Sequence, residues 1–151
     1  MSSVASPQLR SWPERMTQAL LFEIVALVFA VPLYGLFVGA SGAESTRVLV
    51  VISIAVLLWT TVHNFAFDLC ESRLLSRSAS DRPVSVRALH AISHELTAAL
   101  VSVPILVLLG DIGWWKAAWA DIGLSVLYAA CAFVFYAAYD WARPVPQAVR
   151  S

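Results

Sequence analysis

Charged residues are scarce in this sequence, and their scarcity decides its class. Only 13% of the 151 residues are Asp, Glu, Lys or Arg, whereas a soluble domain carries about a quarter. The ten basic and ten acidic residues cancel, which argues against a nucleic-acid partner because such proteins carry excess positive charge. With 60% hydrophobic residues and a mean hydropathy of +0.75, the chain is expected to lie in a membrane.

Cysteines are few, and catalytic motifs are missing. Cys70 and Cys131 form neither a disulfide framework nor a metal-ligand spacing, and Cys131 is interpreted as an apolar packing residue. No nucleophile–base pair and no set of metal ligands stands at a convincing spacing. We therefore expect neither an enzyme nor a bound cofactor.

Four long apolar runs cover residues 16–38, 48–69, 88–109 and 119–139. Each is close to the roughly 20 residues that a helix needs to cross a hydrocarbon core of about 30 Å. We predict an all-α integral membrane protein with four spans and no separate soluble domain. A signal peptide is disfavoured for the first run, because the run is longer than usual and contains Glu23.

Basic residues gather on one side of these spans. Only Arg47 and Lys116 lie in the first and third loops. The others are Arg10, Arg15, Arg73, Arg77, Arg82, Arg87, Arg143 and Arg150, which flank the N-terminus, the central loop and the C-terminus. Cytoplasmic loops carry the excess of Lys and Arg, so both termini and the central loop are predicted to be cytoplasmic.

The sequence repeats itself after 72 residues without a gap. The matched pairs include Arg15 and Arg87, Glu23 and Glu95, Pro32 and Pro104, Ser53 and Ser125, and Asp68 and Asp140. Because each unit has two crossings, both copies enter the membrane in the same direction, which predicts a parallel repeat. We expect a first pair of spans over residues 1–72, a cytoplasmic linker over 73–87 and a second pair over 88–151. In this compact four-helix bundle, span one would face span three and span two would face span four.

Glu23 lies within the first span. An ionised side chain at the centre of a membrane helix costs about 2.5–3.5 kcal/mol, and such residues usually face a bundle interior or a water-filled cavity. Burial disfavours the charged form of a carboxylic acid, so such a group takes up a proton readily. Its anion attracts cations. Glu23 is therefore predicted to be a shared site for a proton and a cationic substrate.

Glu95 is the repeat counterpart of Glu23 and follows His90 and His94. The two histidines share a helix face, but Glu95 points about 100° away from His94. No third ligand is evident, so a metal site is not expected. Glu95 either binds an ion directly or forms hydrogen bonds inside the bundle with a histidine or with Arg87.

A second polar set occupies the inner end of span two, in WTTVHNFAFD. Asn64 and Asp68 share a face, with His63 beside them and Trp59 a further turn up. With Asp140 at the end of span four, these residues are candidates for a cation site in which Trp59 offers a cation–π contact. The alternative is a set of interfacial charges and aromatic side chains.

These motifs resemble those of a known family. RMTQALLFE with WTTVHNFAFD, and RALHAISHE with FVFYAAYD, are similar to the tandem bacterial transmembrane pair units of the proteobacterial antimicrobial compound efflux (PACE) family. The resemblance covers essentially the whole chain. It implies a four-span protein of the bacterial inner membrane that uses the proton gradient to expel biocides such as chlorhexidine, or short diamines. It also implies that Glu23 is the essential membrane carboxylate. Gln18, Thr60 and His63 depart from the family pattern, which leaves the substrate range open.

The leading hypothesis is a proton-coupled exporter of organic cations. Its predicted proton- and substrate-binding residues are Glu23, Glu95, Asn64, Trp59, His63, Asp68, Asp140, His90, Arg15 and Arg87. Four helices enclose little space, so a homodimer is expected, in which Ala19 and Ala26 would allow close helix approach. The alternative hypothesis is a non-transporting membrane scaffold or accessory subunit, whose carboxylates only pair with Arg and His inside the bundle.

Overall fold

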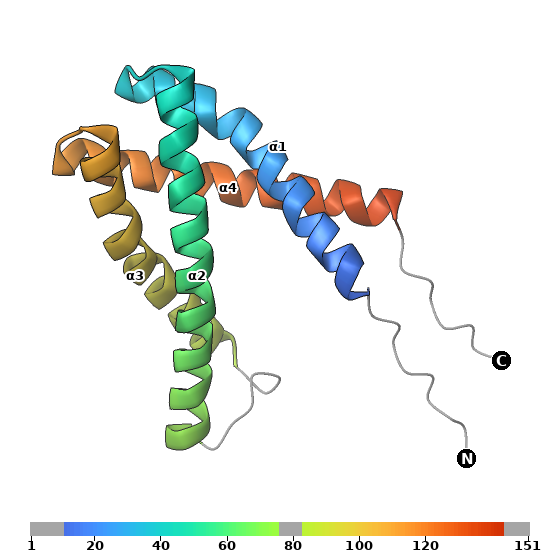
Figure 1. Cartoon of the computed structure of the whole chain (residues 1–151). Coiled ribbons are helices and arrows are strands. Elements are labelled where there is room, and N and C mark those ends of the chain that lie inside the picture. The colour runs from blue at the N-terminus through green and yellow to red at the C-terminus, as the bar shows by residue number, and fades with distance from the viewer. Residues whose placement is uncertain (1–10, 76–82, 144–151) are drawn as a thin grey trace, which may run out of the picture.

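The computed structural model describes residues 11–75 and 83–143. Within them the chain forms four helices, namely α1 (Trp12–Val38), α2 (Gly42–Leu75), α3 (Val84–Gly110) and α4 (Trp114–Ala142) (Figure 1). All four are long and apolar enough to cross a membrane, so the prediction of an all-α protein with four spans is confirmed. Arg10, Arg77, Arg82 and Arg150, which contributed to the charge bias, lie outside the described residues.

The turn between α1 and α2 is short and capped on both sides. Gly39 adopts the left-handed conformation with φ 85°, and its N–H donates to the Gly35 carbonyl at 2.7 Å. At the start of α2, the Ser41 hydroxyl accepts a hydrogen bond from the Glu44 N–H at 3.3 Å. The Glu44 carboxylate accepts one from the Ser41 N–H at 2.9 Å. This reciprocal capping box fixes the point at which the chain reverses direction.

The corresponding turn between α3 and α4 lies beside the first. Asp111 ends α3 in the left-handed conformation with φ 50°. Lys116, near the start of α4, donates from Nζ to the Val38 carbonyl at 3.1 Å and lies 5.9 Å from the centre of the Phe37 ring. A cation is favourable at the carbonyl end of a helix, so Lys116 holds α4 against the end of α1. We call this end of the bundle, with turns 39–41 and 111–113, the hairpin end, and the opposite end the open end.

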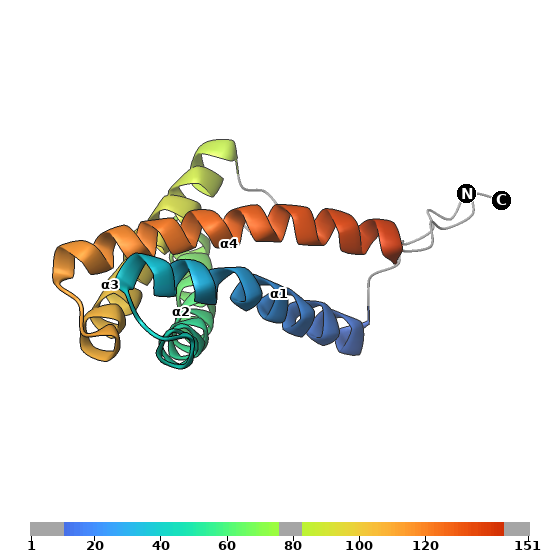
Figure 2. The ribbon, with the colours of Figure 1, turned by 90° about the horizontal axis from the view of Figure 1, so that it is seen from above.

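The helices pack as two pairs that diverge toward the open end. α2 packs mainly against α3, and α1 mainly against α4; Figures 1 and 2 show the two pairs separating away from the hairpin end. Spans one and three were expected to face each other, as were spans two and four, but both pairs lie diagonally across the bundle. The two repeats are related by a twofold axis that exchanges α1 with α3 and α2 with α4. The same axis exchanges the α2–α3 contact with the α1–α4 contact. The equivalent neighbours are therefore these two pairs, and the bundle is not uniformly compact.

The apolar core lies at the hairpin end. Its buried members are Ala30, Tyr34, Val48, Leu49, Leu106, Ala117 and Ala120. The alanines leave room for close helix approach, so all four helices meet here. Most large apolar side chains elsewhere are exposed on the outside of the helices, as expected for a surface that contacts lipid tails.

Gly110 makes a close contact in this core that a larger residue cannot make. A Cβ at Gly110 would lie 2.5 Å from the Tyr34 Oη atom, and the Tyr34 side chain is only 3% exposed. Replacing Gly110 by Ala is expected to lower the free energy of unfolding by about 1–3 kcal/mol, the usual cost of overpacking. The measurement is the thermal unfolding midpoint of the purified protein in detergent.

Two further variants control this prediction. A Cβ at Gly123 meets no heavy atom within 4 Å, so Gly123→Ala should be neutral or slightly stabilising, because Ala favours a helix. Tyr34→Phe removes the clashing oxygen, which is buried and has no hydrogen-bond partner within the described part of the chain. Gly110→Ala combined with Tyr34→Phe should therefore regain most of the lost stability. No recovery in the double variant would contradict the assigned contact.

Candidate functional site

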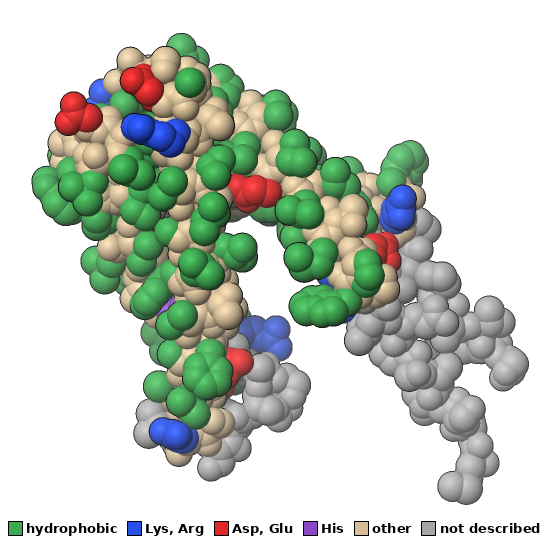
Figure 3. Space-filling model, in the orientation of Figure 1, with side chains coloured by type: hydrophobic (Ala, Val, Ile, Leu, Met, Phe, Trp, Pro, Cys, Tyr) green, Lys and Arg blue, Asp and Glu red, His purple; other side chains and the backbone are tan. Residues whose placement is uncertain are grey.

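A cavity of about 440 Å³ lies among the four helices, on the open-end side of the apolar core. Figure 3 shows the hollow between the two helix pairs, with an acidic side chain where the pairs meet. The lining is mainly apolar, but three carboxyl groups belong to it, those of Glu23, Glu95 and Asp121. No lysine or arginine is among its described lining residues. The cavity can therefore accept an added positive charge.

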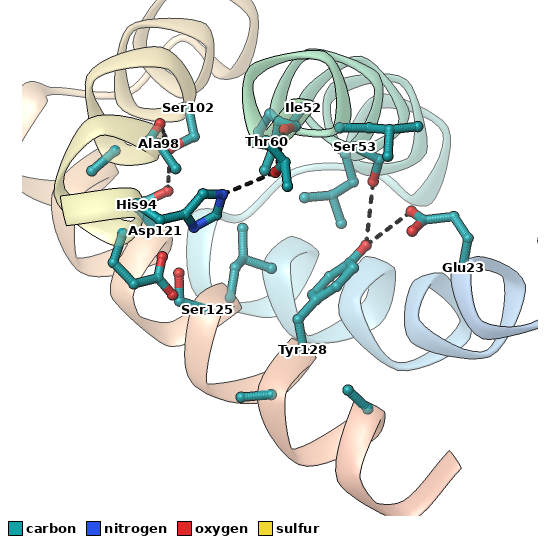
Figure 4. A pocket seen from close by; sticks show the side chains of 18 of the residues that line it. Glu23, Ile52, Ser53, Thr60, His94, Ala98, Ser102, Asp121, Ser125 and Tyr128 are labelled. Atoms are coloured by element: carbon teal, nitrogen blue, oxygen red, sulfur yellow. Dashed lines mark hydrogen bonds between the residues drawn. The ribbon is translucent and has the colours of Figure 1, made fainter. Parts of the chain in front are cut away.

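Glu23 points into this cavity from α1 (Figure 4). Its Oε1 atom accepts a hydrogen bond from the Tyr128 hydroxyl of α4 at 3.3 Å. The same hydroxyl lies 3.4 Å from the Ser53 hydroxyl of α2. The chain Glu23–Tyr128–Ser53 thus joins three helices and fixes the carboxylate at the cavity wall.

An aromatic cluster supports Tyr128. The Phe22 ring centre lies 6.1 Å from that of Tyr128, 5.7 Å from that of Phe135 and 5.6 Å from that of Tyr136. Phe22 and Tyr128 also line the cavity. The cavity therefore offers ring surfaces, which attract both apolar groups and cations, directly beside the Glu23 carboxylate.

Glu95 and His94 line the cavity from α3. The His94 Nε2 atom lies 2.9 Å from the Thr60 hydroxyl of α2, whereas the Glu95 side chain is exposed. In the repeat, Val56 takes the place of Tyr128, and an isopropyl group cannot donate a hydrogen bond. The two glutamates occupy equivalent positions in the repeat but have different surroundings. Glu23 accepts a hydrogen bond from the Tyr128 hydroxyl, whereas the matching residue beside Glu95 is Val56, which has no hydroxyl.

Asp121 is a carboxyl group that the motif search missed. It lines the cavity from α4 and is partly buried, and it accepts a hydrogen bond from the Ser102 hydroxyl of α3. At the 72-residue shift the pair Ser102 and Asp121 aligns with Ala30 and Leu49, two residues of the apolar core. A search for matching residues passes over such a position. The cost of a carboxylate in the fourth apolar run was the signal that could have found it.

The three histidines lie close together, and of them His94 alone lines the cavity. The His63 ring centre lies 5.1 Å from that of His90 and 5.2 Å from that of His94, between α2 and α3. Trp59, one turn earlier on α2, donates from Nε1 to the Thr97 hydroxyl at 3.1 Å. The geometry therefore places Trp59, His63 and His90 in the contact between these two helices.

The remaining predicted site residues lie away from the cavity. They are Asn64, Asp68, Asp140, Arg15 and Arg87, which are exposed and are not among its lining residues. Within residues 11–75 and 83–143, no three His, Cys, Asp or Glu side chains are arranged to hold a metal ion. The chemistry that the cavity offers is thus hydrogen bonding, proton uptake and attraction of a cation in a mainly apolar setting.

Comparison with known proteins adds independent information. A family model described as "BTP: Chlorhexidine efflux transporter" matches the chain twice, over residues 10–73 and 82–145. A short-chain diamines transporter of Vibrio parahaemolyticus is 27% identical over 131 residues, which is 87% of this chain and 91% of the relative. A short-chain diamines transporter of Acinetobacter baylyi is 30% identical over 128 residues, or 83% of this chain and 86% of the relative. No solved structure matches the chain.

Proposed function

Because the chain belongs to the bacterial transmembrane pair family of chlorhexidine efflux transporters, we propose that it exports organic cations such as chlorhexidine or short-chain diamines in exchange for protons. The two relatives compared above are described as short-chain diamines transporters, which supports the second class of substrate. Glu23 serves as the shared site for the proton and the substrate. The protein acts as a multi-pass transporter of the bacterial inner membrane and not as an enzyme.

One observation carries the proposal: Glu23 faces a mainly apolar cavity and is held there by the Tyr128 hydroxyl. A carboxylate in such a setting binds a cation strongly, because the low dielectric strengthens the attraction. The same carboxylate can bind a proton in place of the cation. Proton and substrate therefore compete for one group, and this competition is the requirement for exchange.

The shape of the bundle supports a route for the substrate. The helix pairs separate at the open end and meet at the hairpin end, so the cavity is entered from the open end. Four described arginines, Arg15, Arg73, Arg87 and Arg143, lie toward that end, whereas Arg47 and Lys116 lie near the hairpin end. By the positive-inside rule the open end faces the cytoplasm. The substrate enters from there, and rotation of one helix pair against the other about the apolar core exposes the cavity to the outside.

A homodimer remains part of the proposal, with one revision to its interface. Ala26 is fully buried within the single chain, so it packs α1 against its own bundle. Ala19 lies two turns earlier on nearly the same face of α1, but it is exposed and stays available for contact with a second copy. Cross-linking through Ala19→Cys in native membranes tests this contact.

Exchange in liposomes tests the proposed function. Purified protein is reconstituted in vesicles that contain a pH-sensitive dye, and chlorhexidine or butane-1,4-diamine is added on one side. The expected result is substrate movement coupled to proton movement in the opposite direction, which stops when an ionophore removes the proton gradient. If substrate moves at the rate of protein-free vesicles, the scaffold hypothesis takes the place of transport.

A further inference from the structure

We propose that Asp121, with Ser102, is a second cation-binding group of the cavity, so that a diamine is held by Glu23 at one end and by Asp121 at the other. The inference rests on the proposed function and deepens it. It assigns Asp121 a role in choosing substrates that carry two separated positive charges. The observations that support it are the position, the surroundings and the repeat counterpart of Asp121.

The position of Asp121 suits a ligand with two charged ends. Asp121 and Tyr128 are seven residues apart on α4, which places them about 10 Å apart along the axis and on nearly the same face. Tyr128 donates its hydrogen bond to Glu23 at 3.3 Å, so Glu23 lies at one end of this stretch and Asp121 at the other. Ser125 lies between them, and all of these residues line the cavity (Figure 4).

The length of a short diamine agrees with this separation. In butane-1,4-diamine, bonds of about 1.5 Å place the two nitrogens roughly 6 Å apart. Charge-assisted hydrogen bonds of about 2.8 Å at both ends extend the reach to roughly 12 Å. The methylene groups then lie along the apolar lining, which includes Leu124 of α4 and Ile52 of α2.

The charges of the cavity leave Asp121 available to a cation. No lysine or arginine is among the described lining residues, and His94, the lining residue that can carry a positive charge, contacts Thr60. Ser102 has one hydroxyl proton and two acceptors in reach, the Asp121 carboxyl and the Ala98 carbonyl at 3.1 Å. When an ammonium group donates to Asp121, the hydroxyl turns to Ala98. Asp121 therefore changes partners without leaving a donor unsatisfied.

The repeat indicates that packing does not require this polar pair. Its counterparts Ala30 and Leu49 are almost completely buried in the core, so the equivalent place in the first repeat is filled by apolar side chains alone. A carboxylate in a membrane span costs free energy. A contribution to ligand binding explains why the second repeat has an acid there.

The test compares two amines of equal length by calorimetry on purified full-length protein in detergent. Butane-1,4-diamine has two ammonium groups, and butan-1-amine has one. The native protein is expected to bind the diamine about ten- to a hundredfold more tightly, which is the effect of one hydrogen bond between charged groups. Asp121→Asn should abolish this difference and leave the affinity for the monoamine nearly unchanged.

Matched variants make the result decisive. Asp111→Asn changes the same chemical group in the outer turn, where Asn tolerates the left-handed conformation, and it should keep the diamine preference. Ser102→Ala with Asp121→Leu gives the second repeat the residues of the first, so it should fold and lose the preference. Asp121→Glu should retain part of it.

Three outcomes would overturn the inference. One is a diamine preference that survives Asp121→Asn, and another is a preference that Glu95→Gln removes instead. The third is an equal loss for both amines in Asp121→Asn and in the double variant, which would make Asp121 a structural residue. If the native protein binds neither amine, the proposal that it transports short diamines is contradicted, and with it the role of Asp121. Retained exchange of chlorhexidine would then locate the failure in the choice of substrate.

Discussion

Replacing Glu23 by Gln is expected to abolish proton-driven efflux and to leave the fold intact. Gln keeps the size and the ability to accept the hydrogen bond from Tyr128, but it can neither release a proton nor attract a cation by charge. Loss of a proton-transferring group typically costs a factor on the order of 100 or more. The measurement is the initial rate of chlorhexidine and butane-1,4-diamine efflux from proteoliposomes with an imposed pH gradient.

The repeat supplies the matched control for this prediction. Glu95→Gln makes the same change on α3, where the side chain is exposed and Val56 stands in place of the tyrosine. We expect a smaller loss of transport. Size-exclusion elution and helix content report on the fold of both variants. A Glu23→Gln protein that transports at the native rate would make this carboxylate structural, and one that fails to assemble would favour the scaffold hypothesis.

Removing the hydroxyl of Tyr128 should weaken substrate binding at Glu23 and leave the packing of the aromatic ring unchanged. In Tyr128→Phe the ring still contacts Phe22, but Glu23 and Ser53 lose their common partner. A hydrogen bond to a charged group contributes about 1.5–3 kcal/mol, so transport should fall about ten- to a hundredfold.

Tyr34 offers a control with the same chemistry. Its hydroxyl is buried without a hydrogen-bond partner among the described residues, and it lies in the apolar core outside the cavity lining. Tyr34→Phe should leave the transport rate unchanged and should not destabilise the protein, since removal of an unsatisfied polar group is neutral or favourable. If Tyr34→Phe and Tyr128→Phe affect transport equally, a specific role for Tyr128 is contradicted.

The four helices could be predicted from the sequence because membrane insertion imposes a simple rule on hydropathy. Their ends could not be read from the same rule. α2 continues to Leu75 and α3 begins at Val84, inside the segment expected to be a linker. Apolar length measures only the part of a helix that contacts hydrocarbon, whereas capping and backbone hydrogen bonds set where the helix ends.

Site residues could be predicted from the sequence only where a side chain is energetically costly in a membrane span. Glu23 was found because a carboxylate in a span demands an explanation, and the structure directs it into the cavity. Trp59 and His63 were expected to form a polar lining, yet four residues apart they share the face of α2 that packs on α3. Which face of a helix meets which neighbour depends on all four helices at once. Comparing the two repeats, in turn, identifies the residues that they share. It does not identify Asp121, because the matching residue of the first repeat is Leu49.

The short turn at residues 39–41 has a consequence for how the protein is made. Three residues span at most about 3.5 Å each, far less than the roughly 30 Å of a hydrocarbon core, so α1 and α2 cannot settle in the bilayer far from each other. Once α1 has entered as a span, the capped turn forces α2 to follow as its antiparallel partner. Residues 111–113 impose the same order on α3 and α4. We therefore expect each repeat to insert as one unit during biogenesis, with the turn capped by Ser41 and Glu44 joining the two helices of the first unit.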